Sequence, residues 1–145
     1  MKTFLPWAAV LTLMSSALFA HQTDSPSGLD EALGGSTVAA AYNGHLALGL
    51  AVEAQGGGLD GQLFLASVQE IGMRSAQVAK QLDAIDVGDD PDAGMFKKLS
   101  QVHQQIDNQA RALYEAATGK GPQEKYGEAR KETQRLLDEL FAEEE

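Results

Sequence analysis

The chain has 145 residues, no cysteine and a formal net charge of −10 at pH 7, from 11 basic and 21 acidic residues. The lack of cysteine excludes disulfides, a lipid attached through cysteine, and covalent haem held by a C-x-x-C-H motif. The acidic balance argues against nucleic acid and an anionic membrane surface as partners, because both require clustered positive charge. The negative charge favours solubility, and it would attract a basic partner or cations.

The first 20 residues have the layout of a secretory signal peptide. A positive residue, Lys2, precedes an almost entirely apolar run, and small residues gather before Ala20. This pattern predicts export through the Sec pathway and cleavage after Ala20, with cleavage after Ala17 as the alternative. A membrane anchor is disfavoured, because the segment is short for a bilayer span and ends in small residues. We therefore expect a periplasmic protein that is not inserted in the membrane once residues 1–20 are removed.

Cleavage would leave 125 residues with ten basic and 21 acidic side chains, a net charge of −11. That length suits one packed domain without metals or disulfides. Residues 21–35 are polar and contain glycine, and no helical periodicity extends beyond one turn, so we predict a flexible lead-in there. The domain itself is predicted over residues 36–145.

The first predicted helix covers residues 36–54. Ser36 is a suitable N-cap, and three consecutive glycines at 56–58 form a strong stop signal. Its apolar stripe is Val38, Ala41, His45, Leu48 and Val52. The segment 38–52 carries no charge, but a bilayer span needs about 20 such residues, so a buried bundle helix is the preferred interpretation.

Three further helices follow from apolar residues at steps of three and four. The second covers residues 59–85, the third begins at Pro91 with Asp90 as its cap, and the fourth ends near Ala142 after a turn at 118–122. The predicted inward positions of the second helix are Phe64, Val68, Ile71, Ser75, Val78, Leu82 and Ile85. Those of the third helix are Phe96, Leu99, His103, Ile106, Ala110, Leu113 and Ala117. Those of the fourth helix are Tyr126, Ala129, Thr133, Leu136, Leu137 and Leu140. Four such helices with short links predict an all-α, antiparallel up-down-up-down four-helix bundle.

Two histidines fall on the predicted core stripes. In this topology His45 and His103 both lie roughly 14–18 Å from the same end of the bundle, at about 1.5 Å per residue. Two neutral imidazoles that face an apolar interior suit haem or a divalent metal. The alternative is structural, with each ring hydrogen-bonded to a neighbouring helix or to water.

A third histidine offers a different metal hypothesis. If cleavage follows Ala20, His21 becomes the N-terminal residue and could chelate copper through its amine and imidazole. Motifs for nucleophilic or zinc catalysis, such as G-x-S-x-G and H-E-x-x-H, are absent from the sequence, so we do not predict an enzyme. A protein partner in the periplasm and a homodimer both remain open, although we identify no exposed hydrophobic stripe that demands a dimer.

The layout resembles that of the cytochrome b562 family. The segments "MFKKLSQVHQQIDNQARALYEAATGKG" and "EARKETQRLLDEL" are similar to that family's third and fourth helices in length, turn and polarity. The resemblance implies a periplasmic four-helix bundle that holds haem b non-covalently, between a methionine early in the first helix and a histidine late in the fourth. Here the first predicted helix has no methionine, and Glu139 and Leu140 stand where the histidine is expected.

This departure shapes the functional expectation. The preferred hypothesis is a non-enzymatic binding or stress-related module without a cofactor. The alternatives are an electron carrier that holds haem b through His45 and His103, and a periplasmic protein that binds copper or another metal.

Overall fold

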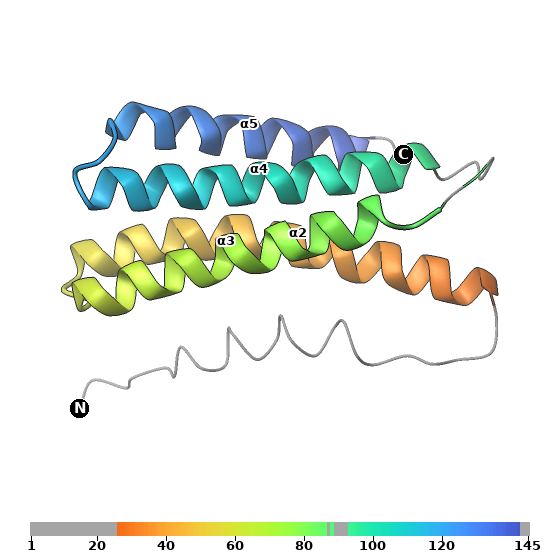
Figure 1. Cartoon of the computed structure of the whole chain (residues 1–145), viewed down its shortest axis with the longest axis horizontal. Helices are drawn as coiled ribbons and strands as arrows, with labels where there is room; N and C mark the ends of the chain where they lie inside the picture. The colour runs from red at the N-terminus through yellow and green to blue at the C-terminus, as the bar shows by residue number, and fades with distance from the viewer. Residues whose placement is uncertain (1–25, 87, 89–92, 143–145) are drawn as a thin grey trace. The chain divides into compact units, whose positions relative to one another are not determined.

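The computed structural model describes the backbone of residues 26–86, 88 and 93–142, and the side chains of those residues from Thr37 onward. In these ranges the secondary structure is helical, in the elements α2 (Pro26–Gly56), α3 (Gly61–Asp83), α4 (Ala93–Ala117) and α5 (Gln123–Ala142) (Figure 1). The predicted all-α four-helix bundle is confirmed. The predicted signal peptide, His21 and the predicted cap at Asp90 and Pro91 lie outside the described residues.

Helix α2 is longer than the sequence predicts. It begins at Pro26, ten residues before the predicted cap at Ser36, so residues 26–35 are helical. Proline suits a first turn, because its missing N–H would have no partner there. Glycine costs a helix about 1 kcal/mol per residue relative to alanine, which lowers helix stability but does not forbid a helix through Gly34 and Gly35. The chain divides into two compact units, Met1–Ala40 and Ala41–Glu145, and the boundary falls inside α2.

The predicted glycine stop separates α2 from α3. Gly58 has a φ of +96°, a left-handed conformation that glycine adopts without steric cost. Asp60 then caps α3, because its Oδ1 accepts hydrogen bonds from the backbone N–H of Gln62 at 3.0 Å and of Leu63 at 3.1 Å. The sequence predicted the break correctly and placed the start of α3 two residues early.

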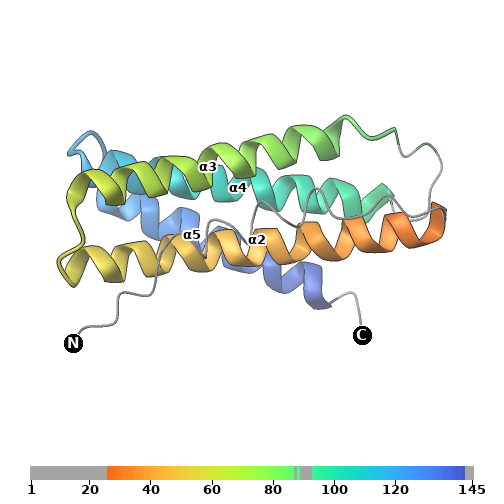
Figure 2. The same ribbon diagram turned by 90° about the horizontal axis from the view of Figure 1, so that it is seen from below.

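Within the second unit, α4 packs against α3. The Oγ of Ser100 donates to Oδ1 of Asp83 at 2.5 Å, near the end of α3 and the start of α4. Further along, Gly72 approaches the side chain of Ala110. Residue numbers rise on one helix as they fall on the other, so the contacts join α3 and α4 in antiparallel sense (Figures 1 and 2).

Helix α4 also packs against α5. The amide nitrogen of Gln105 donates to the carbonyl oxygen of Ala129 at 3.4 Å. Close to the connecting turn, Nζ of Lys125 lies 3.9 Å from a carboxylate oxygen of Glu115. These contacts again run in opposite directions along the two helices, so α4 is shared between α3 and α5.

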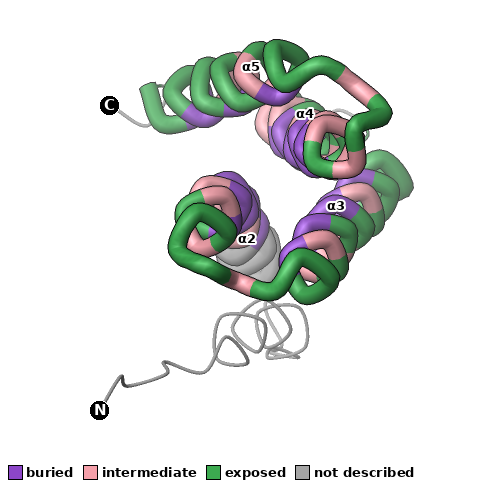
Figure 3. The backbone as a smooth tube through the Cα atoms, turned by 90° about the vertical axis from the view of Figure 1, so that its left-hand side faces the viewer, coloured by how far each residue is buried: buried purple, intermediate pink, exposed green. Residues whose placement is uncertain are grey.

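The buried faces of the four helices form one apolar core, which Figure 3 shows as inward-facing buried segments. Its members in the second unit are Ala41, Ala47, Leu48, Ala51, Phe64, Val68, Ile71, Val102, Ile106, Ala110, Leu113, Tyr126 and Leu137. The predicted stripes are largely confirmed. Ile85 and Ala117 are wrong, because both are exposed at the ends of their helices. Within the described residues, no helix is both long and apolar enough to cross a bilayer.

Candidate functional site

His45 is buried, and it is hydrogen-bonded inside the bundle. The residue is 5% exposed, and its Nδ1 lies 3.0 Å from Oε1 of Gln109 on α4. With the proton on Nδ1, the ring donates to the Gln109 carbonyl oxygen, which defines its tautomer and orientation. Gln109 is itself fully buried. The inward position of His45 agrees with the prediction from its spacing. The pattern of apolar residues does not indicate Gln109, because a glutamine is normally expected on the polar face of a helix.

His103 is also buried, at 1% exposure, and it lies on α4 six residues before Gln109. Six residues correspond to about 9 Å along a helix axis. His45 is therefore bonded to a residue almost two helical turns beyond His103 on α4. A single haem iron would have to be ligated directly by both rings. The hypothesis of a haem held by His45 and His103 stays a prediction.

The hydrogen bond between His45 and Gln109 makes a testable contribution to stability. We expect His45→Leu and Gln109→Leu each to lower the free energy of unfolding by about 1–3 kcal/mol, because each leaves a buried polar partner unsatisfied. The double variant should lose less than the two single losses combined, since both polar groups are then gone. Urea unfolding of the four proteins provides the double-mutant cycle. Strict additivity would show that the two side chains do not interact.

Other polar atoms in the core lack partners. Among the described residues, Oγ of Ser75, Nε2 of Gln109 and the hydroxyl of Tyr126 are buried without a hydrogen-bond partner.

The described residues contain no group of three or more His, Cys, Asp or Glu side chains placed to hold a metal ion. The copper hypothesis depends on His21, which lies outside this part of the chain.

The outer side of α2 carries large apolar side chains. Tyr42, Leu46 and Leu50 are 43%, 44% and 52% exposed, and they follow one another at intervals of four residues. Phe141 of α5 is 42% exposed. Its ring centroid lies 6.3 Å from that of Tyr42, and the planes of the two rings are nearly perpendicular. We call these four residues the α2 patch. From the sequence alone we identify no exposed hydrophobic stripe that demands a dimer, and whether the α2 patch demands one stays a prediction.

The position of the α2 patch could not be read from periodicity. The stretch 38–52 is uncharged on every side, so its apolar residues do not mark one face. Packing decides the matter by burying Ala41, Leu48 and Ala51 and leaving the opposite positions exposed. Arg130 of α5 lies beside Gly49, because a Cβ built on Gly49 would lie 3.5 Å from a guanidinium nitrogen of Arg130.

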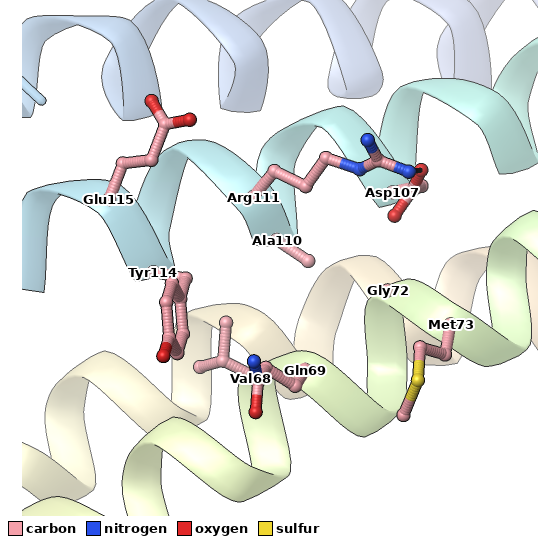
Figure 4. A pocket seen from close by; sticks show the side chains of 9 residues that line it. All are labelled: Val68, Gln69, Gly72, Met73, Asp107, Ala110, Arg111, Tyr114 and Glu115. Atoms are coloured by element: carbon pink, nitrogen blue, oxygen red, sulfur yellow. Dashed lines mark ion pairs between the residues drawn. The ribbon is translucent and has the colours of Figure 1, made fainter. Parts of the chain in front are cut away.

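A hollow of about 350 Å³ lies on the outer surface where α3 meets α4 (Figure 4). Tyr114 and Val68 stand at one end and Met73 at the other, while Arg111 extends along α4 toward Asp107. The hollow is also lined by Gln69, Gly72, Ala110 and Glu115. Neither buried histidine contributes to it.

Two of the charged residues in this hollow form an ion pair. The guanidinium of Arg111 lies 2.7 Å from Oδ2 of Asp107, one helical turn away. The hydrogen bond and the charge of Asp107 raise the pKa of Arg111. Since the Arg111 side chain is largely exposed, this pair is an ordinary surface ion pair of small energetic value.

Comparison with protein-family models, with curated proteins and with solved structures finds no match for this chain.

Proposed function

We propose that this protein is a non-enzymatic helical binding module of the periplasm that needs no cofactor and binds its partner through the α2 patch. The observation that carries the proposal is the exposure of four large apolar side chains together on a chain that otherwise has a net charge of −10. Exposed apolar clusters on small proteins commonly mark interaction surfaces, because leaving them in water costs free energy.

The interior of the bundle supports the cofactor-free part of the proposal. His45 is already hydrogen-bonded by Gln109, so its burial has a structural explanation. At the position where the cytochrome b562 family would place a histidine ligand stand Glu139 and Leu140, and neither can replace an imidazole on haem iron. We therefore limit the resemblance to that family to the architecture of the bundle.

The compartment is proposed from residues 1–20. Their positive start, apolar run and small residues are typical of a Sec signal peptide. A chain without cysteine is compatible with an oxidising compartment, since it has no thiol to cross-link wrongly.

The cofactor question can be tested on the protein without residues 1–20. We expect one cooperative thermal unfolding transition whose midpoint does not change when equimolar haem or Cu²⁺ is added, because a ligand stabilises only a fold that binds it. A Soret band that is lost in His45→Ala and His103→Ala would replace the proposal with a haem carrier. Copper binding that disappears when His21 is removed would replace it with a metal-binding protein.

The binding surface can be tested in producing cells. A photoreactive amino acid in place of Leu46 should form a covalent adduct with the partner after irradiation, because Leu46 lies in the middle of the α2 patch. Leu63 of α3 is the matched position, since it is 51% exposed and lies outside the patch. The proposal fails if Leu46 gives no more adduct than Leu63.

A further inference from the structure

We infer that the partner of the α2 patch is a second copy of this chain, packed against the first by an antiparallel α2–α2 contact centred on Leu46. This inference rests on the proposed function, because it names the partner of the same surface. The two-fold axis runs across α2 at Leu46, so each copy contributes the same residues to the contact.

The spacing of the patch suits such symmetry. Tyr42 and Leu50 lie four residues before and after Leu46, or about 6 Å on either side of it along the helix. A two-fold axis across Leu46 sets Tyr42 of each copy against Leu50 of the other and Leu46 against itself. The three α2 residues of the patch therefore meet at matching positions in the two copies, as an interface between identical subunits requires.

Charge points to the same face. Two chains of net charge −10 repel one another over most of their surfaces. The segment 38–52 is free of charged residues, and the first carboxylate that follows it is Glu53. A basic partner would find no carboxylate on this stretch to bind, whereas a second copy can approach here without bringing like charges together.

The flanking residues of α5 favour the antiparallel direction. Phe141 lies beside Tyr42, and the guanidinium of Arg130 lies beside Gly49, so they mark opposite ends of the patch. The same two-fold axis brings Phe141 of each copy toward Arg130 of the other, and a guanidinium on an aromatic face is a favourable contact. A parallel dimer would instead set each α2 residue against its own copy and place the two α5 helices on opposite sides.

The first test measures self-association of the chain that lacks residues 1–20. The patch is small for a dimer interface, so we expect a weak dimer that appears in sedimentation runs between micromolar and millimolar protein and strengthens with added salt, which screens the repulsion. Leu46→Asp should weaken the dimer at least tenfold, because it sets two carboxylates together at the axis. Leu63→Asp is the matched control and should leave it unchanged. The comparison requires that both variants unfold at the same temperature as the parent protein, which shows that they are folded.

The second test reads the direction of the contact from cysteines, since the chain has none of its own. Under mild oxidation, Leu46→Cys should form a disulfide-linked dimer, and so should a mixture of Tyr42→Cys with Leu50→Cys. Tyr42→Cys alone should not, because the two copies of residue 42 are about 12 Å apart along the helix, beyond the reach of a disulfide. Efficient linking of Tyr42→Cys alone would overturn the antiparallel arrangement.

Failure of this inference is distinguishable from failure of the proposed function. A chain that stays monomeric at every concentration, while the photoreactive Leu46 variant links to a different protein, overturns the second copy and leaves the binding module. Absence of both self-association and any Leu46 adduct overturns both.

Discussion

Phe64→Ala should lower the free energy of unfolding by about 3–5 kcal/mol, the usual loss when a large buried aromatic side chain is truncated and a cavity remains. Phe64 lies near the start of α3, is completely buried and belongs to the apolar core. In a domain of this size the loss corresponds to a drop of at least about 10 °C in the unfolding temperature. Thermal and urea unfolding, followed by far-ultraviolet circular dichroism, measure it.

The neighbouring residue provides the control. Leu63 is on the same helical turn but is 51% exposed, so Leu63→Ala should change the stability by no more than about 0.5 kcal/mol. Similar losses in the two variants would mean that α3 is rotated about its axis relative to the orientation described above.

Gly72→Val should lower the free energy of unfolding by about 1–3 kcal/mol, because it forces extra atoms into a packed contact. A Cβ at Gly72 would lie 3.0 Å from the Cβ of Ala110 and 3.1 Å from Oδ1 of Asp107, both on α4. Either α3 and α4 move apart or the two side chains shift, and both responses disturb the packing between these helices.

Gly127 of α5 is the opposite case. A Cβ built there meets nothing within 4 Å, so Gly127→Ala should raise the stability by roughly 0.5–1 kcal/mol through helix propensity alone. The two glycine variants are thus expected to have effects of opposite sign, which chemical unfolding resolves directly. A stabilising Gly72→Val would contradict the close contact between α3 and α4.

The periodicity of apolar residues predicts most of the fold. It works best for α3 and α4, where charged residues mark the outer face and the buried positions recur every three or four residues. It fails at the beginning of α2. The pair Gly34 and Gly35 is a general stop signal, but a helix that starts at Pro26 continues through both. Propensity is a weak indicator when the surrounding residues still favour the helix.

The candidate sites were predicted less completely. The inward positions of His45 and His103 follow from spacing, and both are confirmed as buried. The partner of His45 does not follow, because the pairing with Gln109 joins residues 64 positions apart and depends on how α2 is rotated against α4. The α2 patch was missed for a related reason: on an uncharged helix, only the packed neighbours determine which apolar residues stay exposed.

The bond between His45 and Gln109 also has a consequence for the order in which the chain acquires its structure. Helices α3, α4 and α5 meet through residues close in sequence, such as Asp83 with Ser100, and these loops close at small entropic cost. Helix α2 is synthesised first, yet its anchor at Gln109 emerges more than sixty residues later. Until then an uncharged, largely apolar stretch of α2 lacks its contact with α4, and that interval is when a newly made molecule is most prone to aggregate or to require a chaperone.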